Sequence, residues 1–269
     1  MPTSENAMTG VAIGAALNGI KSVVTHQRID FFLLAMDQLV NGAAKWHYMF
    51  GSQQSVPITI RLILGRGWGQ GPTHSQNLQA WFAHMPGLKV VMPTSPEDAK
   101  GLLTASILDP NPVVFLEHRW LHNAKGIVPE GFYSKPLGKA KKVKSGKDVT
   151  IVTMSYMTIE ALHAAEYLEK NGISCDVIDL LTIRPIDWET IYNSVKKTGK
   201  ALIVQEDTLF GGISSDISAF INENCFEFLD APVKRSGSIE TPIPFSKNLE
   251  NIYLQKNNLI EIINELIKY

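Results

Sequence analysis

Residues 148–180 read DVTIVTMSYMTIEALHAAEYLEKNGISCDVIDL. The segments 148–154 and 174–180 are short, apolar and rich in β-branched residues, which is typical of buried strands. Between them, residues 159–172 have the length and composition of a helix that ends at Gly172. A strand, a helix and a second strand in this order predict a parallel βαβ unit, in which the helix covers one face of the sheet.

The same alternation continues on both sides of this unit. The later part of the chain predicts strands at 201–206 and 231–237 and helices at 187–199, 212–226 and 257–269. The earlier part predicts strands at 22–24, 56–64, 89–93 and 112–117 and helices at 10–19, 30–50 and 94–108. Two such series predict an α/β protein with two parallel-sheet domains, residues 1–120 and 147–269. The lysine-, glycine- and proline-rich residues 121–146 predict a solvated linker between them.

Composition and charge restrict the class of protein. The chain has 269 residues, of which 45% are hydrophobic and 19% charged, and its formal net charge is −1. That charge gives no general attraction to nucleic acid or to an acidic membrane, and no apolar segment is long enough to predict a membrane span. Cys175 and Cys225 form no CxxC motif, and the N-terminus does not have the pattern of a secretory signal. We therefore expect a cytoplasmic protein in a reducing compartment.

Few residues point to chemistry by themselves. Glu5 precedes a small-residue helix, and its simplest interpretation is a carboxylate at a helix entry. The glycine-rich segment 65–72 has neither the P-loop nor the dinucleotide-binding pattern, so a flexible loop is the simplest interpretation. However, this segment leads to His74, just before a predicted helix, which is where α/β folds place ligand contacts. Asp109 begins an Asp-Pro-Asn-Pro segment that is typical of a turn.

Several longer segments together resemble one family. They are SENAMTGVAIGAALNGI (4–20), MDQLVNGAAKWHYMFG (36–51), HSQNLQAWFAHMPGLKVVMPTSPEDAKGLL (74–103), NPVVFLE (111–117) and SCDVIDLLTIRPID (174–187). In this order they are similar to the β subunit of thiamine diphosphate-dependent 2-oxoacid dehydrogenases, which act on pyruvate, branched-chain 2-oxoacids or acetoin. The resemblance runs from about Ser4 to the C-terminus. It implies a pyrimidine-binding transketolase-like domain followed by a domain like the transketolase C-terminal domain.

The resemblance also assigns roles to three side chains. It implies that Glu5 hydrogen-bonds N1′ of the cofactor aminopyrimidine and so activates the cofactor. His74 then corresponds to a histidine near the reacting end of the cofactor, where it orients the substrate or passes a proton to the acyl acceptor. Phe31 corresponds to an aromatic residue that packs on the aminopyrimidine side. The sequence departs from the family here, because Arg28 and Ile29 stand where Phe-Ala is common.

A structural potassium site of some family members aligns with four residues of this chain. They are Ile58, Ser106, Asp109 and Asn111. In the family, the contacts at the first two positions are backbone carbonyls. The resemblance therefore implies a possible K⁺ site at these residues.

The resemblance implies that this chain holds half of an active site. In the family, a Gly-Asp-Gly motif on the α subunit binds the diphosphate and Mg²⁺, and this chain has no Gly-Asp-Gly. The implied assembly is an α₂β₂ heterotetramer with a second β subunit, which can dock on a lipoyl acyltransferase core. The implied activity, present only with the α subunit, is pyruvate dehydrogenase-like oxidative decarboxylation with acyl transfer to lipoyl.

Family members usually carry a further helix and strand before this glutamate. We therefore expect either that the start is truncated or that a neighbouring chain fills the gap. Two other functions stay open. One is a non-catalytic docking or assembly subunit of the same fold. The other is half of a split transketolase, which would need a sugar-phosphate site of basic residues, whereas Arg66, Arg119 and Arg184 are scattered along the sequence.

Overall fold

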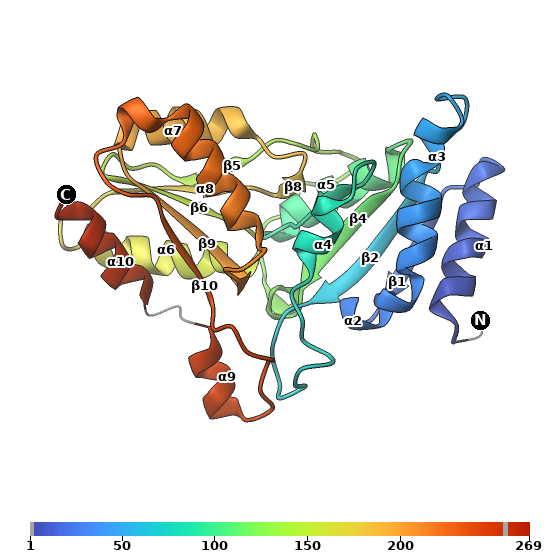
Figure 1. Ribbon diagram of the computed structural model, residues 1–269, viewed down its shortest axis with the longest axis horizontal. Helices are drawn as coiled ribbons and strands as arrows, with labels where there is room; N and C mark the ends of the chain where they lie inside the picture. Colours follow the sequence, from blue (N-terminus) through green and yellow to red (C-terminus); the bar gives the residue numbers. More distant parts are fainter. Residues whose placement is uncertain (1–2, 255–257) are drawn as a thin grey trace.

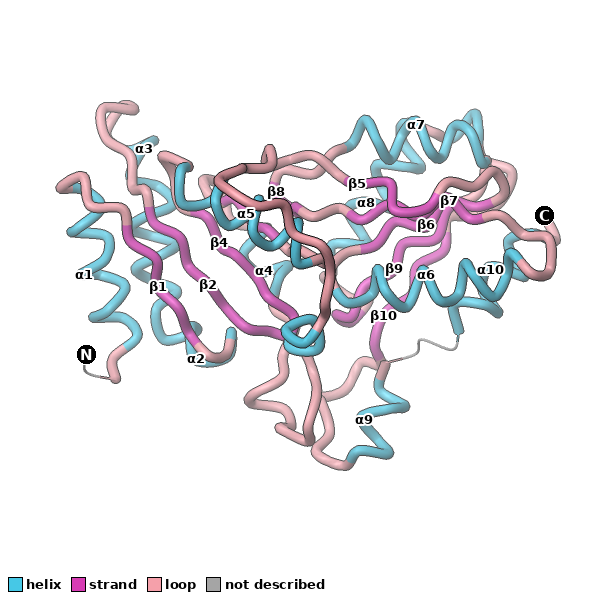
Figure 2. The backbone as a smooth tube through the Cα atoms, turned by 180° about the vertical axis from the view of Figure 1, so that it is seen from behind, coloured by secondary structure: helices cyan, strands magenta, loops and turns pink. Residues whose placement is uncertain are grey.

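The computed structural model describes residues 3–254 and 258–269. These residues form two five-stranded sheets that lie side by side along the long axis of the molecule (Figure 1, Figure 2). The strand order is β1-β2-β4-β3-β8 in the first sheet and β10-β9-β6-β7-β5 in the second. The α/β fold with two sheets, which the sequence predicts, is confirmed.

The first sheet is parallel except at one edge. Its parallel strands are β1 (Ser22–His26), β2 (Ile58–Leu64), β4 (Val113–His118) and β3 (Lys89–Val91). The last strand, β8 (Thr182–Arg184), runs antiparallel to β3. Because β8 belongs to the second half of the chain, the later residues complete the first sheet. The sequence predicts a purely parallel sheet, and the antiparallel β8 departs from that prediction.

The second sheet has the same design. Its parallel strands are β10 (Lys234–Ser238), β9 (Ala201–Thr208), β6 (Val149–Thr153) and β7 (Cys175–Asp179). An antiparallel edge strand, β5 (Lys141–Lys144), pairs with β7. The sequence predicts a linker where β5 lies. Its lysines suit an edge strand, because charged side chains keep a sheet edge from pairing with other chains.

Helices cover both faces of the second sheet. α7 (Trp188–Thr198) and α8 (Ile213–Asn224) lie on one face, and α6 (Tyr156–Glu169) and α10 (Asn258–Ile267) lie on the other (Figure 1, Figure 2). α6 joins β6 to β7, so the predicted βαβ unit is confirmed. The predicted last helix starts at residue 257, which lies outside the described residues.

The helices of the first sheet include one irregular segment. α1 (Glu5–Leu17) begins five residues earlier than predicted, whereas α5 (Pro96–Leu108), which Ser95 caps, agrees with the predicted helix 94–108. The predicted helix 30–50 is divided into shorter pieces. They are α2 (Ile29–Phe32), a 3₁₀ turn (Leu33–Ala35), a π-helical segment (Gln38–Ala43) and α3 (Ala44–Met49).

Several short elements were not predicted. α4 (Gln79–His84) is the helix expected after His74, but α9 (Lys247–Tyr253) was missed, as were 3₁₀ turns at Arg119–Asn123 and Phe226–Phe228. α9 lies beside the glycine-rich loop that follows β2 (Figure 1, Figure 2). No helix in the described part of the chain is both long and apolar enough to cross a membrane.

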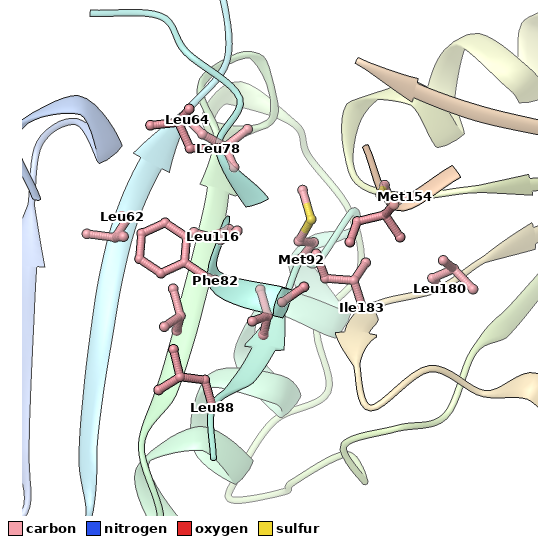
Figure 3. Packing of buried hydrophobic residues seen from close by; sticks show 14 of the residues in the cluster. Leu62, Leu64, Leu78, Phe82, Leu88, Met92, Leu116, Met154, Leu180 and Ile183 are labelled. Carbon is pink, nitrogen blue, oxygen red and sulfur yellow. The ribbon is translucent and has the colours of Figure 1, made fainter. Parts of the chain in front are cut away.

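One hydrophobic core joins the two sheets. It contains buried side chains of the first sheet and its helices, and it continues without a break into the second sheet. Figure 3 shows part of this continuity. The labelled residues are Leu62, Leu64, Leu78, Phe82, Leu88, Met92, Leu116, Met154, Leu180 and Ile183. The shared core fixes the carboxyl ends of the strands in both sheets relative to one another.

Candidate active site at the carboxyl ends of the strands

The candidate cofactor-binding residues lie where the parallel strands end. β1 ends at His26, β4 ends at His118, and Gly65 directly follows β2. Because these strands are adjacent and parallel, their carboxyl ends form one edge of the sheet. This edge is where open α/β sheets bind ligands. The first residue of α1, the short helix α2 and the glycine-rich loop all lie at this end of the sheet (Figure 1, Figure 2).

Glu5 is the first residue of α1, and its side chain is half-buried. Its position suits the positive end of the helix dipole. Among the described residues, Glu5 has no hydrogen-bond or ion-pair partner. The carboxylate is thus available to a ligand at this edge.

His26 is the neighbour of Glu5 that the sequence did not identify. Burial lowers the pKa of His26, and the negative charge of Glu5 offsets this only in part. The ring packs edge-on against Phe32 at 5.0 Å, and its buried Nε2 has no hydrogen-bond partner in the described structure. A histidine at the end of a predicted strand was the available signal, but no nearby motif distinguished it from a core histidine.

Phe31 and His74 meet at this edge although they are far apart in sequence. Their rings lie 5.2 Å apart in an edge-to-face arrangement. The contact is held by Asp30, whose Oδ1 accepts a hydrogen bond of 2.8 Å from the side-chain amide of Gln76. Thr73 Oγ1 lies 2.9 Å from His74 Nδ1. The structure therefore brings together two of the three side chains that the resemblance associated with the cofactor.

The glycine-rich loop is packed on both of its sides. Gly65 and Gly71 have positive φ angles of 92° and 74°. A Cβ atom at Gly65 would overlap the His118 ring, and one at Gly71 would overlap the Phe245 ring, just before α9. The glycines thus allow close approach of other segments. The simple interpretation as a flexible loop does not describe this segment.

A buried carboxylate from the second sheet accepts hydrogen bonds from residues beside the site. Glu206, on β9, accepts hydrogen bonds from His118 Nε2 at 2.8 Å, the Arg66 backbone at 3.2 Å and Asn77 Nδ2 at 3.3 Å. The Trp120 backbone N–H donates to His118 Nδ1, so the proton of the neutral ring lies on Nε2. Burial alone would raise the pKa of Glu206, but His118 and the Arg66 charge outweigh it and hold that pKa at about 2.

The four residues of the expected K⁺ site occupy adjacent segments. Ile58 begins β2, and Asn111 precedes β4, its neighbour in the sheet. Asp109 Oδ1 accepts a bond of 2.9 Å from the Asn111 N–H, while its Oδ2 pairs with the ammonium group of Lys89. Ser106 donates to the Leu102 carbonyl at 2.7 Å. In the described residues, Lys89 supplies the positive charge at Asp109.

The site fits half of a thiamine diphosphate pocket. A free carboxylate and an aromatic–imidazole pair suit an aminopyrimidine ring, which needs a hydrogen-bond partner and an apolar wall. Within the described ranges, no group of three or more His, Cys, Asp or Glu side chains could hold a metal ion. The residues present therefore suit the pyrimidine part of the cofactor.

Family models match both halves of the chain. Residues 1–124 match the transketolase pyrimidine binding domain and residues 138–260 match the transketolase C-terminal domain. A solved structure described as a split gene transketolase, inactive beta4 tetramer, has a TM-score of 0.76 at 24% identity over 98% of this chain and 81% of its own. The protein therefore has the transketolase-like fold.

Curated relatives define the family more closely. The acetoin:2,6-dichlorophenolindophenol oxidoreductase β subunit of Cupriavidus necator is 44% identical over 94% of this chain and 75% of the relative. The pyruvate dehydrogenase E1 component β subunit of Rickettsia felis is 41% identical over 100% and 82%. The 2-oxoisovalerate dehydrogenase β subunit of Bacillus subtilis is 42% identical over 97% and 80%. The chain belongs to this family of 2-oxoacid dehydrogenase β subunits.

Proposed function

We propose that this chain is the catalytic β subunit of a thiamine diphosphate-dependent 2-oxoacid dehydrogenase of the pyruvate dehydrogenase type. The observation that carries this proposal is the unpartnered Glu5 carboxylate at the same sheet edge as the Phe31–His74 pair. An acid, an aromatic ring and an imidazole from three segments have no evident structural reason to converge there.

The cofactor supplies an electron sink for cleavage of the bond between the 2-oxo carbon and the carboxylate. Glu5 holds a proton at N1′ of the aminopyrimidine, and this positioned proton transfer contributes about 10²–10⁴ in rate. Phe31 would pack against the pyrimidine side, and its ring contact positions His74. His74 orients the substrate or passes a proton to the acyl acceptor.

The active site requires a second chain. A partner α subunit supplies the residues that hold the diphosphate and Mg²⁺, and the full assembly contains a second β subunit. The acceptor is a lipoyl group on an acyltransferase core, in the cytoplasm. Support for the partner comes from the absence of a Gly-Asp-Gly motif in this sequence.

A potassium ion at Ile58, Ser106, Asp109 and Asn111 is part of the proposal. K⁺ would be bound by backbone carbonyls together with Asp109, whose carboxylate already pairs with Lys89. The ion would therefore compete with the Lys89 ammonium. Thermal unfolding of the complex in K⁺ and in Na⁺ tests this: stabilisation by K⁺ that the Asp109→Asn variant lacks is expected, and equal stability in both salts would contradict the site.

The experiment that tests the function combines purification with an activity screen. The tagged chain is recovered from a native extract, and its partners are identified by mass spectrometry. A stoichiometric partner with a Gly-Asp-Gly motif, together with cofactor-dependent turnover of pyruvate, a branched 2-oxoacid or acetoin, is expected. A stable complex with no cofactor-dependent turnover of any 2-oxoacid would instead indicate a non-catalytic assembly subunit. Turnover of a ketose phosphate would indicate half of a split transketolase.

A further inference from the structure

A group of arginines converges beside the candidate site. Arg28 lies two residues after the end of β1, Arg119 directly follows β4, and Arg66 lies in the loop after β2. These strands are neighbours, so their carboxyl ends bring the three side chains to one edge of the sheet. These arginines are far apart in the sequence, but they lie at the same edge of the sheet.

Arg28 is a buried cation for which the described residues provide no ion-pair partner. It is 6% exposed, and its only hydrogen bond in the described structure is a 3.5 Å contact from Nη1 to the Gly65 carbonyl. Asp30 is the carboxylate that faces it, but Asp30 forms no ion pair with it and bonds to Gln76 instead. A buried guanidinium is normally paired, because an unpaired charge is costly to remove from water.

Arg119 adds a second positive charge beside the first. Its guanidinium stacks on the Trp68 ring at 4.1 Å, and its Nη1 lies 3.3 Å from His122 Nδ1. Its buried Nε has no partner among the described residues. Burial and the charge of Arg119 together lower the pKa of Arg28, and Asp30 opposes this effect. The two arginines therefore repel each other unless an anion lies between or beside them.

We propose that Arg28 and Arg119 bind an acidic group of the substrate at the side of the candidate active site. Two guanidinium groups suit a carboxylate or a phosphate, since each can donate two parallel hydrogen bonds. Arg28 lies three residues before Phe31, so an anion held there is close to the ring that contacts His74. This role rests on the proposed thiamine diphosphate chemistry, but it departs from pyruvate as the substrate, because pyruvate has no second acidic group.

The bound group is distal to the reacting carboxylate. A carboxylate that leaves as carbon dioxide loses its charge, and two arginines on it would stabilise the substrate more than the transition state. A second acidic group keeps its charge throughout the reaction. The substrate class is thus a 2-oxo compound with a carboxylate or phosphate at its other end.

The first test measures binding in the assembled complex without turnover. Tryptophan fluorescence or calorimetry follows the addition of glutarate or of inorganic phosphate, which lack a 2-oxo group. We expect saturable binding of one of them, weakened about 10- to 100-fold by Arg28→Gln or Arg119→Gln, because each removes a charge-assisted interaction. Arg28→Lys keeps the charge and recovers part of the affinity. Arg184→Gln, at the exposed last position of the edge strand β8, is the matched control and leaves binding unchanged.

The second test measures substrate choice. Pyruvate, 2-oxoglutarate and xylulose 5-phosphate are compared in the wild type and in the Arg28→Gln variant. We expect a selective loss of kcat/KM for the acidic substrate, and the one affected identifies carboxylate or phosphate. Equal binding of the anions by the wild type and both arginine variants would overturn the inference. Loss of the α subunit from the Arg28→Gln complex would also overturn it, because the counter-ion of Arg28 would then belong to the partner. Arginine-dependent anion binding without any 2-oxoacid turnover would leave the inference standing while the proposed function fails.

Discussion

Replacing Glu206 with glutamine should weaken the junction between the two sheets. Three donors converge on its two oxygens, His118 Nε2 on one and the Arg66 N–H and Asn77 Nδ2 on the other. A glutamine amide has one acceptor oxygen and one NH₂ group. In either orientation, its NH₂ group therefore faces a donor, so at least one buried hydrogen bond is lost.

The magnitude follows from burial. His118 and Glu206 have side-chain exposures of 1% and 5%. An unsatisfied buried donor costs about 1–3 kcal/mol, and a hydrogen bond to a charged group is worth about 1.5–3 kcal/mol. We expect a loss near 3 kcal/mol, which lowers the melting temperature by roughly 6–12 °C for a chain of this size.

Urea and thermal unfolding of the Glu206→Gln chain, followed by tryptophan fluorescence and circular dichroism, measure this effect. Glu169→Gln is the control, because Glu169 forms an exposed pair with Lys144 at 2.8 Å that is worth at most about 1 kcal/mol. Since Glu206 joins the sheets, the two probes should also separate in the variant. A surface substitution usually changes the free energy of unfolding by about 0.5 kcal/mol or less. A Glu206→Gln chain whose free energy of unfolding lies within about 0.5 kcal/mol of the wild-type value would therefore refute the reasoning.

Three further predictions concern pH, backbone conformation and thiol reactivity. Burial raises the pKa values of Asp179 and Asp207 to about 7 from 3.8, so stability should rise as the pH falls from 7 towards 3.8, and Asp179→Asn should remove part of this rise in urea midpoints measured across pH. The depressed pKa of Glu206 acts in the opposite sense, and its contribution should be lost between pH 4.5 and about 2, a loss absent from Glu206→Gln. Gly65→Ala should lower the free energy of unfolding by more than about 3 kcal/mol in the same assay. Gly131→Ala, at a similar positive φ with open space around it, should lower it by about 1–2 kcal/mol, and equal losses would contradict the His118 overlap. Burial raises the pKa of the Cys175 thiol to about 12, so a disulfide reagent should modify it at least about 100-fold more slowly in the native chain than in urea; rapid native labelling would be inconsistent with its burial.

Local patterns in the sequence predicted the main elements well. The βαβ unit around α6 and the helices predicted at 94–108 and 187–199 lie where the local sequence places them, and Ser95 and Asp187 cap the two helices. These features depend on residues within one or two turns. The elements missed by the sequence, β5, β8 and α9, are short, and pairing or packing with distant segments decides their structure.

The site was less predictable than the fold. The resemblance identified Phe31 and His74 separately, but their contact depends on Asp30 and Gln76, which no local pattern connects. Glu206 was missed because its partners lie far from it in sequence. Its signal was a charged residue inside an apolar strand, since such a residue is rarely buried without a partner. The roles assigned to Glu5, Phe31 and His74 stay predictions.

The most direct test of the proposed function is the exchange of the cofactor C2 proton with D₂O. It is measured in the complex assembled with the α subunit, with wild-type chain and with the Glu5→Gln variant. We predict that the variant binds thiamine diphosphate with affinity within about threefold of wild type but exchanges the proton at least about 100-fold more slowly. Exchange within tenfold of the wild type, on the same scale of roughly 10²–10⁴ for positioned proton transfer, would contradict the catalytic role of Glu5.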